Sequence, residues 1–276
     1  MTPARTPREQ PTDEATKPRL DARMGEDAAT EGWHYDTVAD LDQGLSERLR
    51  SFPRQPDMLV YGVRSAAAIA LRGLLRGYHR FSVEGRENLP RQGSFVMVAN
   101  HASHLDALCL LSALPLCKLH RAFPAAAQDY FFVSLPRLAV AAVLVNALPF
   151  DREVNVRQTL TLCRELLANP GNVLILFPEG TRTVSGVMGA FKPGVGVMLA
   201  GMDVPVVPCF LHGAHSAWPK GKRLPRPSKL HLVIGQPRCY RDLPPSKDSA
   251  LHIRTELEDA VAALSMHAEA RAMEAS

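Results

Sequence analysis

The stretch VMVANHASHLD, residues 96–106, ends an apolar run at Asn100 and then places His101, His104 and Asp106 within six positions. A carboxylate that binds one ring nitrogen of a histidine fixes the tautomer and makes the other nitrogen more basic. That second nitrogen can remove a proton from a hydroxyl group. The residues therefore allow three interpretations: a metal site, the start of an ordinary helix, or a histidine–aspartate pair for general-base catalysis.

The metal interpretation has the weakest support. Ligands on one helix are usually four residues apart, as in H-E-x-x-H, and here the spacings are three, two and five. The helix-start interpretation is stronger, because Ser103 and Asp106 have the spacing of a capping box before the apolar run ALCLL. We expect no metal ion, and we expect His104 to be exposed or to lie behind the site.

The catalytic interpretation depends on how the chain turns after His101. This residue follows the run SFVMVAN, which is typical of a buried strand, and α/β folds place their sites at the carboxyl ends of such strands. Five residues of helix rotate by about 140°, so the two side chains share no helical face. They meet only if His101 precedes the helix and Asp106 reaches back from its first turn. No serine or cysteine nearby is placed as a nucleophile, so the hydroxyl would belong to a substrate.

A second polar segment, LFPEGTRTVSG, also follows an apolar run. Gly180 permits close approach of the backbone, Thr181 offers a hydroxyl, and Arg182 offers a fork of donors that suits phosphate. Lys192 follows in FKPG, and Arg152 ends PFDR after another apolar run. Three cations at strand ends indicate an anionic headgroup on the substrate, although a lone arginine is more often a solvated surface charge.

Apolar valine-rich runs and amphipathic runs alternate around these motifs. The expected strands cover 94–100, 120–127, 172–180, 204–211 and 229–235, and the expected helices cover 106–114, 155–167, 194–200 and 251–264. This alternation favours an α/β fold with a central, mostly buried sheet flanked by helices. We expect a single domain of this class, preceded by an amphipathic helix and a disordered N-terminal tail.

The expected organisation has four segments. Residues 1–55 form the mostly disordered tail, 56–80 the amphipathic helix, 81–245 the domain with both motifs, and 246–276 the C-terminal helix. Asp248 or Ser249 is the expected N-cap of that last helix.

The amphipathic helix has an apolar and a basic side. Four apolar residues recur at i, i+3, i+4 and i+7, namely Leu71, Leu74, Leu75 and Tyr78. Three arginines recur every four residues on the opposite side, namely Arg72, Arg76 and Arg80. Such a helix suits an anionic membrane surface. The alternative is a helix that packs on the core and leaves its basic side in solvent.

Composition indicates a globular protein. The 276 residues are 46% hydrophobic and 22% charged, and the net charge of +4 is too small to indicate nucleic-acid binding. Five scattered cysteines without a C-x-x-C pair predict reduced thiols. The N-terminus has no apolar signal region, and the longest apolar segment, at 138–148, is too short to span a bilayer. We expect a cytoplasmic protein bound peripherally to the cytoplasmic face of a membrane.

The motifs together resemble those of the glycerolipid acyltransferase family, whose best-known members are the 1-acylglycerol-3-phosphate acyltransferases. The family's N-H-x4-D block stands here as NHASHLD, its F-P-E-G-T-R-S block as FPEGTRT, and its V-P-x-V-P block as VPVVP. Its G-x-I-F-I-D-R block is matched by NALPFDR, with Asn146 for the glycine and Pro149 for the phenylalanine. The resemblance covers residues ~80–240, and the six-residue match of FPEGTR is its most specific part.

The resemblance implies acyl transfer from acyl-CoA or acyl carrier protein to the hydroxyl of a lysophospholipid, most simply 1-acylglycerol 3-phosphate. His101 would be the general base and Asp106 its orienting partner. The implied binding residues for the acceptor are Arg152, Glu179, Gly180, Thr181, Arg182 and Lys192. No cofactor, metal or covalent acyl-enzyme is implied. Backbone amides near Ser103 are one candidate for binding the thioester oxyanion.

Three alternatives remain open. The same chemistry could act on glycerol 3-phosphate or on a lyso-lipid with another headgroup, such as an acylated amino acid. The protein could be a catalytically silent scaffold that binds membranes. Water could replace the lipid hydroxyl, which would make the enzyme a thioester hydrolase.

Overall fold

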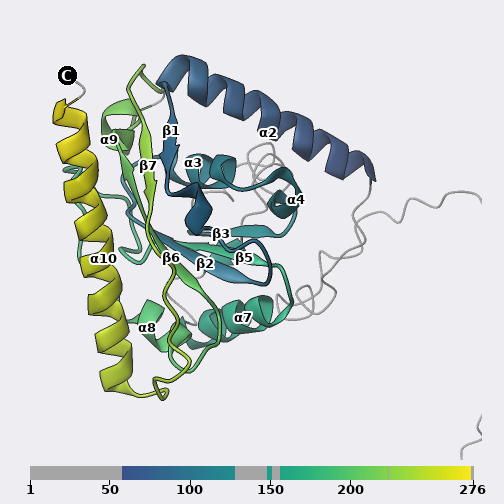
Figure 1. Ribbon diagram of the computed structural model, residues 1–276, viewed down its shortest axis with the longest axis vertical. Helices are drawn as coiled ribbons and strands as arrows, with labels where there is room; N and C mark the ends of the chain where they lie inside the picture. Colours follow the sequence, from purple (N-terminus) through teal and green to yellow (C-terminus); the bar gives the residue numbers. More distant parts are fainter. Residues whose placement is uncertain (1–57, 128–147, 151–155, 223, 275–276) are drawn as a thin grey trace, which may run out of the picture. The chain divides into compact units, whose positions relative to one another are not determined.

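A computed structural model describes residues 58–127, 148–150, 156–222 and 224–274 (Figure 1). Several sequence expectations lie outside these described residues: the tail 1–55, almost all of the apolar segment 138–148, and both Asp151 and Arg152.

The described residues form helices and one sheet. The helices are α2 (Met58–His79), α3 (Asp106–Ala113), α4 (Leu116–Leu119), α7 (Val156–Ala168), α8 (Gly194–Leu199), α9 (Ala214–Ala217) and α10 (Lys247–Glu274), with a short 3-10 helix η1 (Arg86–Asn88). The strands are β1 (Ser82–Glu84), β2 (Phe95–Ala99), β3 (Ala122–Ala127), β4 (Leu148–Phe150), β5 (Val173–Leu176), β6 (Val206–His212) and β7 (His231–Ile234). Every expected strand and helix is present. Strands β1 and β4 were not expected, because three residues are too few to show an alternation of apolar and polar side chains.

The order of the strands brings two of the motifs, NHASHLD after β2 and FPEGTR after β5, to one edge of the sheet. The order is β1-β7-β6-β2-β5-β3-β4. Strands β6, β2, β5, β3 and β4 run parallel, β7 pairs antiparallel with β6, and β1 runs parallel to β7. The carboxyl ends of β2, β5 and β6 therefore lie together, and the segments that follow these strands meet there.

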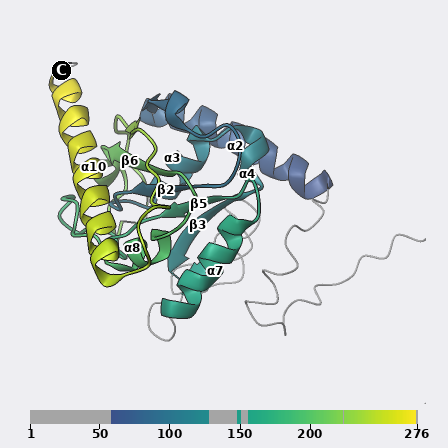
Figure 2. The same ribbon diagram turned by 60° about the horizontal axis from the view of Figure 1, so that its bottom comes forward.

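Helices cover both faces of the sheet (Figure 2). Along β2, Phe95 and Met97 point into a core formed with α2 and α3, while Val96 and Val98 point into a second core formed with α7, α8 and α10. Every residue of β2 is buried, as alternation between two covered faces requires. The expected central, mostly buried sheet flanked by helices is confirmed.

The start of α10 differs from the expectation. Ser246 is the N-cap, because its Oγ accepts the backbone N–H of Ser249 at 3.1 Å. The assignment of the cap to Asp248 or Ser249 was therefore wrong: three residues able to cap stand within four positions, and apolar spacing does not choose between them. The first turn of α10 packs closely on α8, since a Cβ atom on Gly196 would lie 1.9 Å from the carbonyl oxygen of Ala250.

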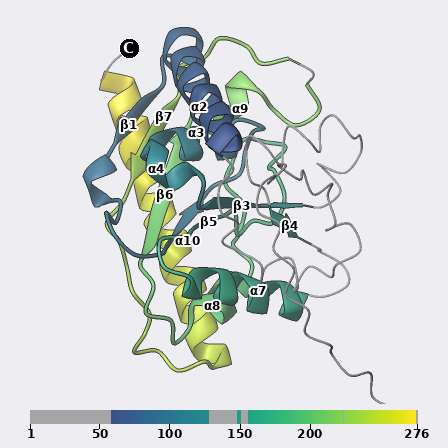
Figure 3. The ribbon, with the colours of Figure 1, turned by 90° about the vertical axis from the view of Figure 1, so that its right-hand side faces the viewer.

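Helix α2 lies over α3 and α4 (Figure 3), but its two sides are not those expected. Leu75 is 1% exposed and packs on the core, whereas Leu74 is 58% and Tyr78 42% exposed. Arg72 points toward the domain, where its Nε donates to the carbonyl of Ser112 at 3.1 Å and its Nη2 to that of Leu114. The expected division of faces was wrong because Arg72 binds the last carbonyls of α3, which a cation at a helix C-terminus stabilises.

The solvent side of α2 is consequently apolar. Its large exposed apolar residues, which we call the apolar strip, are Val63, Ile69, Leu74 and Tyr78. Tyr61 of α2 is also exposed, at 40%, but its ring stacks on His120. The positions between them on this side are exposed glycines and alanines: Gly62, Ala66, Ala70, Gly73 and Gly77.

Candidate active site

His101 and Asp106 are in contact at the carboxyl end of β2. The Nδ1 atom of His101 lies 2.8 Å from Oδ2 of Asp106. The Asp106 side chain is fully buried and the His101 side chain is 21% exposed. His101 precedes α3 and Asp106 is its first residue, so the carboxylate reaches back along the turn as the spacing required. The geometry of a general base with an orienting carboxylate is present.

Asp106 also holds the turn itself. Its Oδ2 accepts the backbone N–H groups of Ala102 at 2.7 Å and Ser103 at 2.8 Å. One half of the expected capping box therefore forms. The other half does not, because the Oγ of Ser103 accepts the N–H of Leu105 at 3.1 Å and donates to the carbonyl of Trp218 at 2.8 Å. Since the Ala102 and Ser103 amides are bound to Asp106, the expectation that amides near Ser103 bind the thioester oxyanion was wrong for these two.

The His101 ring is held on a second side by the residue that follows β5. It stacks on Phe177, with ring centroids 4.2 Å apart and planes at 17°. No hydrogen bond to its Nε2 is found among the described residues. With Nδ1 donating to the carboxylate, Nε2 is the nitrogen free to accept a proton.

Glu179 and Asn100 hold the backbone around this ring. Glu179 Oε1 accepts the backbone N–H of His101 at 2.6 Å, and its Oε2 accepts that of Gly189 at 2.8 Å. Burial raises the pKa of Glu179, and these two hydrogen bonds oppose the rise. The Asn100 amide bonds both the N–H and the carbonyl of Leu211 in β6. Glu179, predicted as a substrate ligand, thus has both oxygens bound to backbone, and that role stays a prediction.

The cationic residues of the second motif are gathered at the turn after β5. Gly180 has φ +73°, and a Cβ atom there would lie 2.7 Å from Nζ of Lys192. The backbone N–H of Lys192 donates to the carbonyl of Pro178 at 2.9 Å. Glycine adopts this left-handed conformation without strain, and a side chain at this position would require the Lys192 side chain to move. Thr181 is exposed next to it. The expectation that Gly180, Thr181 and Lys192 share one site is consistent with this placement.

Arg182 is paired with a residue that the sequence interpretation set aside. Its Nη1 lies 2.7 Å from Nδ1 of His104, whose ring lies against Trp218 with centroids 4.9 Å apart. Burial, with smaller contributions from Arg182 and His101, lowers the pKa of His104 to about 4. His104 is therefore neutral near pH 7 and accepts a hydrogen bond from the guanidinium. His104 is half-buried and positions Arg182. Its spacing from His101 in the sequence did not predict this contact.

The described part of the chain holds no group of three or more His, Cys, Asp or Glu side chains that could bind a metal ion. None of its helices is both long and apolar enough to cross a bilayer.

Known proteins match the part of the chain that carries this site. The family profile described as Acyltransferase matches residues 80–212. A 1-acyl-sn-glycerol-3-phosphate acyltransferase of Chlamydomonas reinhardtii is 33% identical over 62% of this chain and 49% of its own. An enzyme of the same name from Pseudomonas aeruginosa is 29% identical over 69% of this chain and 66% of its own. The chain spans about half the length of the first of these.

A solved structure has the same fold. It is the 1-acyl-sn-glycerophosphate acyltransferase PlsC of Thermotoga maritima, which matches with a TM-score of 0.57 and 22% identity. The match covers 79% of this chain and 86% of that one.

Proposed function

The chain belongs to the glycerolipid acyltransferase family, and from this premise we propose that it transfers a fatty acyl group from a thioester to the hydroxyl of a lysophospholipid. The proposed acceptor is 1-acylglycerol 3-phosphate, and the donor is acyl-CoA or acyl carrier protein. One observation carries the proposal: the buried Asp106 orients His101, whose Nε2 has no hydrogen-bond partner among the described residues. The turn at Gly180, beside which Lys192 lies, is held at the same edge of the sheet.

The reaction requires one base and no covalent intermediate on the protein. Nε2 of His101 removes the proton of the acceptor hydroxyl while that oxygen attacks the thioester carbonyl. The new C–O bond forms, the C–S bond breaks, and the leaving thiolate takes the proton back from His101. The Asp106 carboxylate stays hydrogen-bonded to Nδ1, and its negative charge stabilises the imidazolium that exists between these two proton transfers.

The turn after β5 binds the acceptor phosphate in this proposal. Lys192 and Arg182 supply positive charge, Gly180 lets the headgroup approach the backbone, and the Thr181 hydroxyl adds a hydrogen bond. Arg152, from the second family block, is proposed as a further ligand. Glu179 shapes the same turn through its two backbone contacts.

The acceptor is an amphiphile, so the enzyme must meet a lipid surface. We place the apolar strip of α2 against the acyl chains of the membrane, on its cytoplasmic face. This differs from the orientation expected from sequence, in which the arginines were to be the contact side. Supporting the new orientation, the solvent side of α2 carries large apolar residues separated by glycine and alanine.

The decisive test is turnover of the His101→Ala variant. General-base catalysis contributes about 10²–10⁴-fold, and we expect a loss of that size with unchanged folding. The matched control is His252→Ala, an exposed histidine of α10. Near-normal acyl transfer by His101→Ala would remove the mechanism.

A product analysis identifies the substrates. Purified protein is given acyl-CoA or acylated carrier protein with 1-acylglycerol 3-phosphate, glycerol 3-phosphate or a lyso-amino-acid lipid, and the products are identified by mass spectrometry. Phosphatidic acid as the main product supports the proposal. Release of free fatty acid alone would indicate a hydrolase, and lipid binding without any product would indicate a scaffold.

A further inference from the structure

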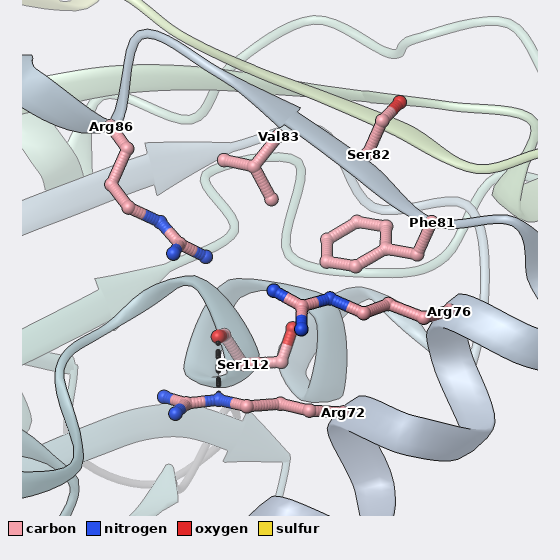
Figure 4. Close-up of a pocket in the computed structure, with 7 residues that line it drawn as sticks. All are labelled: Arg72, Arg76, Phe81, Ser82, Val83, Arg86 and Ser112. Carbon is pink, nitrogen blue, oxygen red and sulfur yellow. Dashed lines mark hydrogen bonds between the residues drawn. The ribbon is translucent and has the colours of Figure 1, made fainter.

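A cavity away from His101 lies between α2, α3 and the β1–η1 segment (Figure 4). Its volume is about 270 Å³. Arg72 and Arg76 enter it from α2 and Arg86 from η1, with Phe81 and Val83 of the β1 segment on one side. Ser112, which also lines it, is six residues after Asp106 on α3, or about 9 Å along the helix axis. The cavity is thus separate from the catalytic pair.

The three guanidinium groups converge on this space without a neutralising charge. No described carboxylate forms an ion pair with any of them. Arg72 is engaged with the carbonyls at the end of α3, whereas the side chains of Arg76 and Arg86 have no hydrogen bond within the described residues. Burial lowers the pKa of Arg72, and the charges of Arg86 and Arg76 lower it further. An anion in the cavity would relieve this repulsion.

We propose that this cavity binds the headgroup phosphate of an anionic phospholipid, as a membrane contact separate from the catalytic site. Arginine presents a planar fork of donors that matches phosphate oxygens, and two such forks, from Arg76 and Arg86, face the cavity from different elements. The volume far exceeds the ~10–15 Å³ that a single water needs, so a phosphate group with its first ester substituents has room.

The neighbouring surface indicates a lipid rather than a soluble phosphate as the ligand. Arg76 stands on α2 one turn before Arg80 and beside the solvent side that carries the apolar strip. Ile69, which is 57% exposed, stands seven residues before Arg76, so the two side chains lie on the same side of α2 about 10 Å apart along its axis. A lipid with its phosphate at Arg76 would have its acyl chains beside Ile69. At an interfacial helix, lipid acyl chains usually lie beside the apolar face and the headgroups contact basic side chains. The inference extends the membrane attachment proposed above and needs no assumption about the acceptor.

The experiment measures vesicle binding by sedimentation, with neither acyl donor nor acceptor present. The vesicles are phosphatidylcholine alone, phosphatidylcholine with phosphatidylglycerol, or phosphatidylcholine with oleate at equal surface charge. Phosphatidylglycerol is neither substrate nor product of the proposed reaction, so its binding does not report on the catalytic site. The variant is R76Q/R86Q. The control is R80Q/R91Q, which removes two exposed arginines and the same charge.

The wild type should bind the phosphatidylglycerol vesicles best, and R76Q/R86Q should lose about tenfold or more of that affinity, as expected for two charge-assisted contacts. R80Q/R91Q should retain most of it. Equal losses in both variants, or equal binding to the oleate vesicles, would mean a general charge effect and overturn the proposal. Competition by coenzyme A or inorganic phosphate at the cavity would overturn the assignment to lipid.

Folding and activity readouts keep this result separate from the proposed function. Circular dichroism checks that R76Q/R86Q is folded, and R86Q alone, outside α2, repeats the test if it is not. Turnover of a detergent-dispersed lysophospholipid should be unchanged in R76Q/R86Q. A wild type that binds the vesicles but transfers no acyl group would contradict the proposed function and leave the cavity assignment standing.

Discussion

Replacement of Asp106 by Asn should separate catalysis from folding. Asn keeps an oxygen that can accept the N–H groups of Ala102 and Ser103, but it removes the charge that faces Nδ1 of His101. At 2.8 Å, unit charges on the imidazolium and the carboxylate attract by about 6 kcal/mol at an effective dielectric constant of about 20. This upper limit corresponds to about 10⁴-fold in turnover. We expect a loss of about 10²–10⁴-fold.

The stability of the same variant should change little. Two charge-assisted hydrogen bonds become neutral ones, which lowers the free energy of unfolding by no more than about 2 kcal/mol. Asp106→Ala is the contrasting variant, because it leaves the buried N–H groups of Ala102 and Ser103 without an acceptor. Each unpaired group costs about 1–3 kcal/mol, so the expected loss is about 2–6 kcal/mol.

Both variants are assayed for thiol release from the acyl donor and for urea unfolding followed by circular dichroism. The expected pattern is a large loss of turnover in both and marked destabilisation in Asp106→Ala alone. Turnover of Asp106→Asn within about threefold of wild type would refute the role of the charge, given the attraction calculated above. Equal unfolding free energies for the two variants would refute the structural role of the backbone contacts.

Three further predictions concern other parts of the structure. The pKa of His104 is about 4 in the folded protein and 6.5 in an unconstrained histidine, so the unfolded chain binds more protons between these values and stability falls as the pH drops from 6.5 to 4. The Tm of His104→Gln should decline less over this interval, and parallel declines would contradict the reasoning. Gly196→Ala should lower the free energy of unfolding by about 1–3 kcal/mol, because its Cβ would meet the backbone of α10. Gly194→Ala on the same helix should leave that free energy unchanged, because its Cβ would meet open space. Urea unfolding of the pair checks this, and equal stabilities would disprove it. Lys192→Gln should raise KM for a phosphate-bearing acceptor by about tenfold or more, with Lys220→Gln as the exposed control; an equal effect on an uncharged monoacylglycerol would exclude a phosphate contact.

The sequence predicted the structure best where the local pattern of apolar residues alone determines the element, as in the buried strands. Valine-rich runs buried on both faces predict parallel strands, and β2, β5 and β6 are all present where expected. Because such strands end at one edge, the proximity of His101 and the FPEGTR turn follows from the topology. The contact between His101 and Asp106 was predictable for the same reason: only a turn before a helix lets residues five apart meet.

Other features depend on contacts between distant segments. The position of His104 depends on Arg182 and Trp218, which lie 78 and 114 residues further along the chain. The sides of α2 could not be assigned from spacing, since Arg72 is held inward by the carbonyls of α3. Apolar periodicity predicts that a helix forms. It does not predict which side of the helix faces the core when a charged residue binds a buried partner.

The carboxylate of Glu179 closes the loop between β5 and α8 at its base. It joins the backbone of Gly189 to that of His101, and the exposed residues 184–187 lie between these ends, where the carbonyl of Val184 lies 3.0 Å from Nε2 of His215. Sequence changes at the tip of this loop leave the catalytic backbone in place, because the ends of the loop are fixed independently of its length. The tip can therefore be exchanged with the corresponding segment of a relative without moving the backbone of His101.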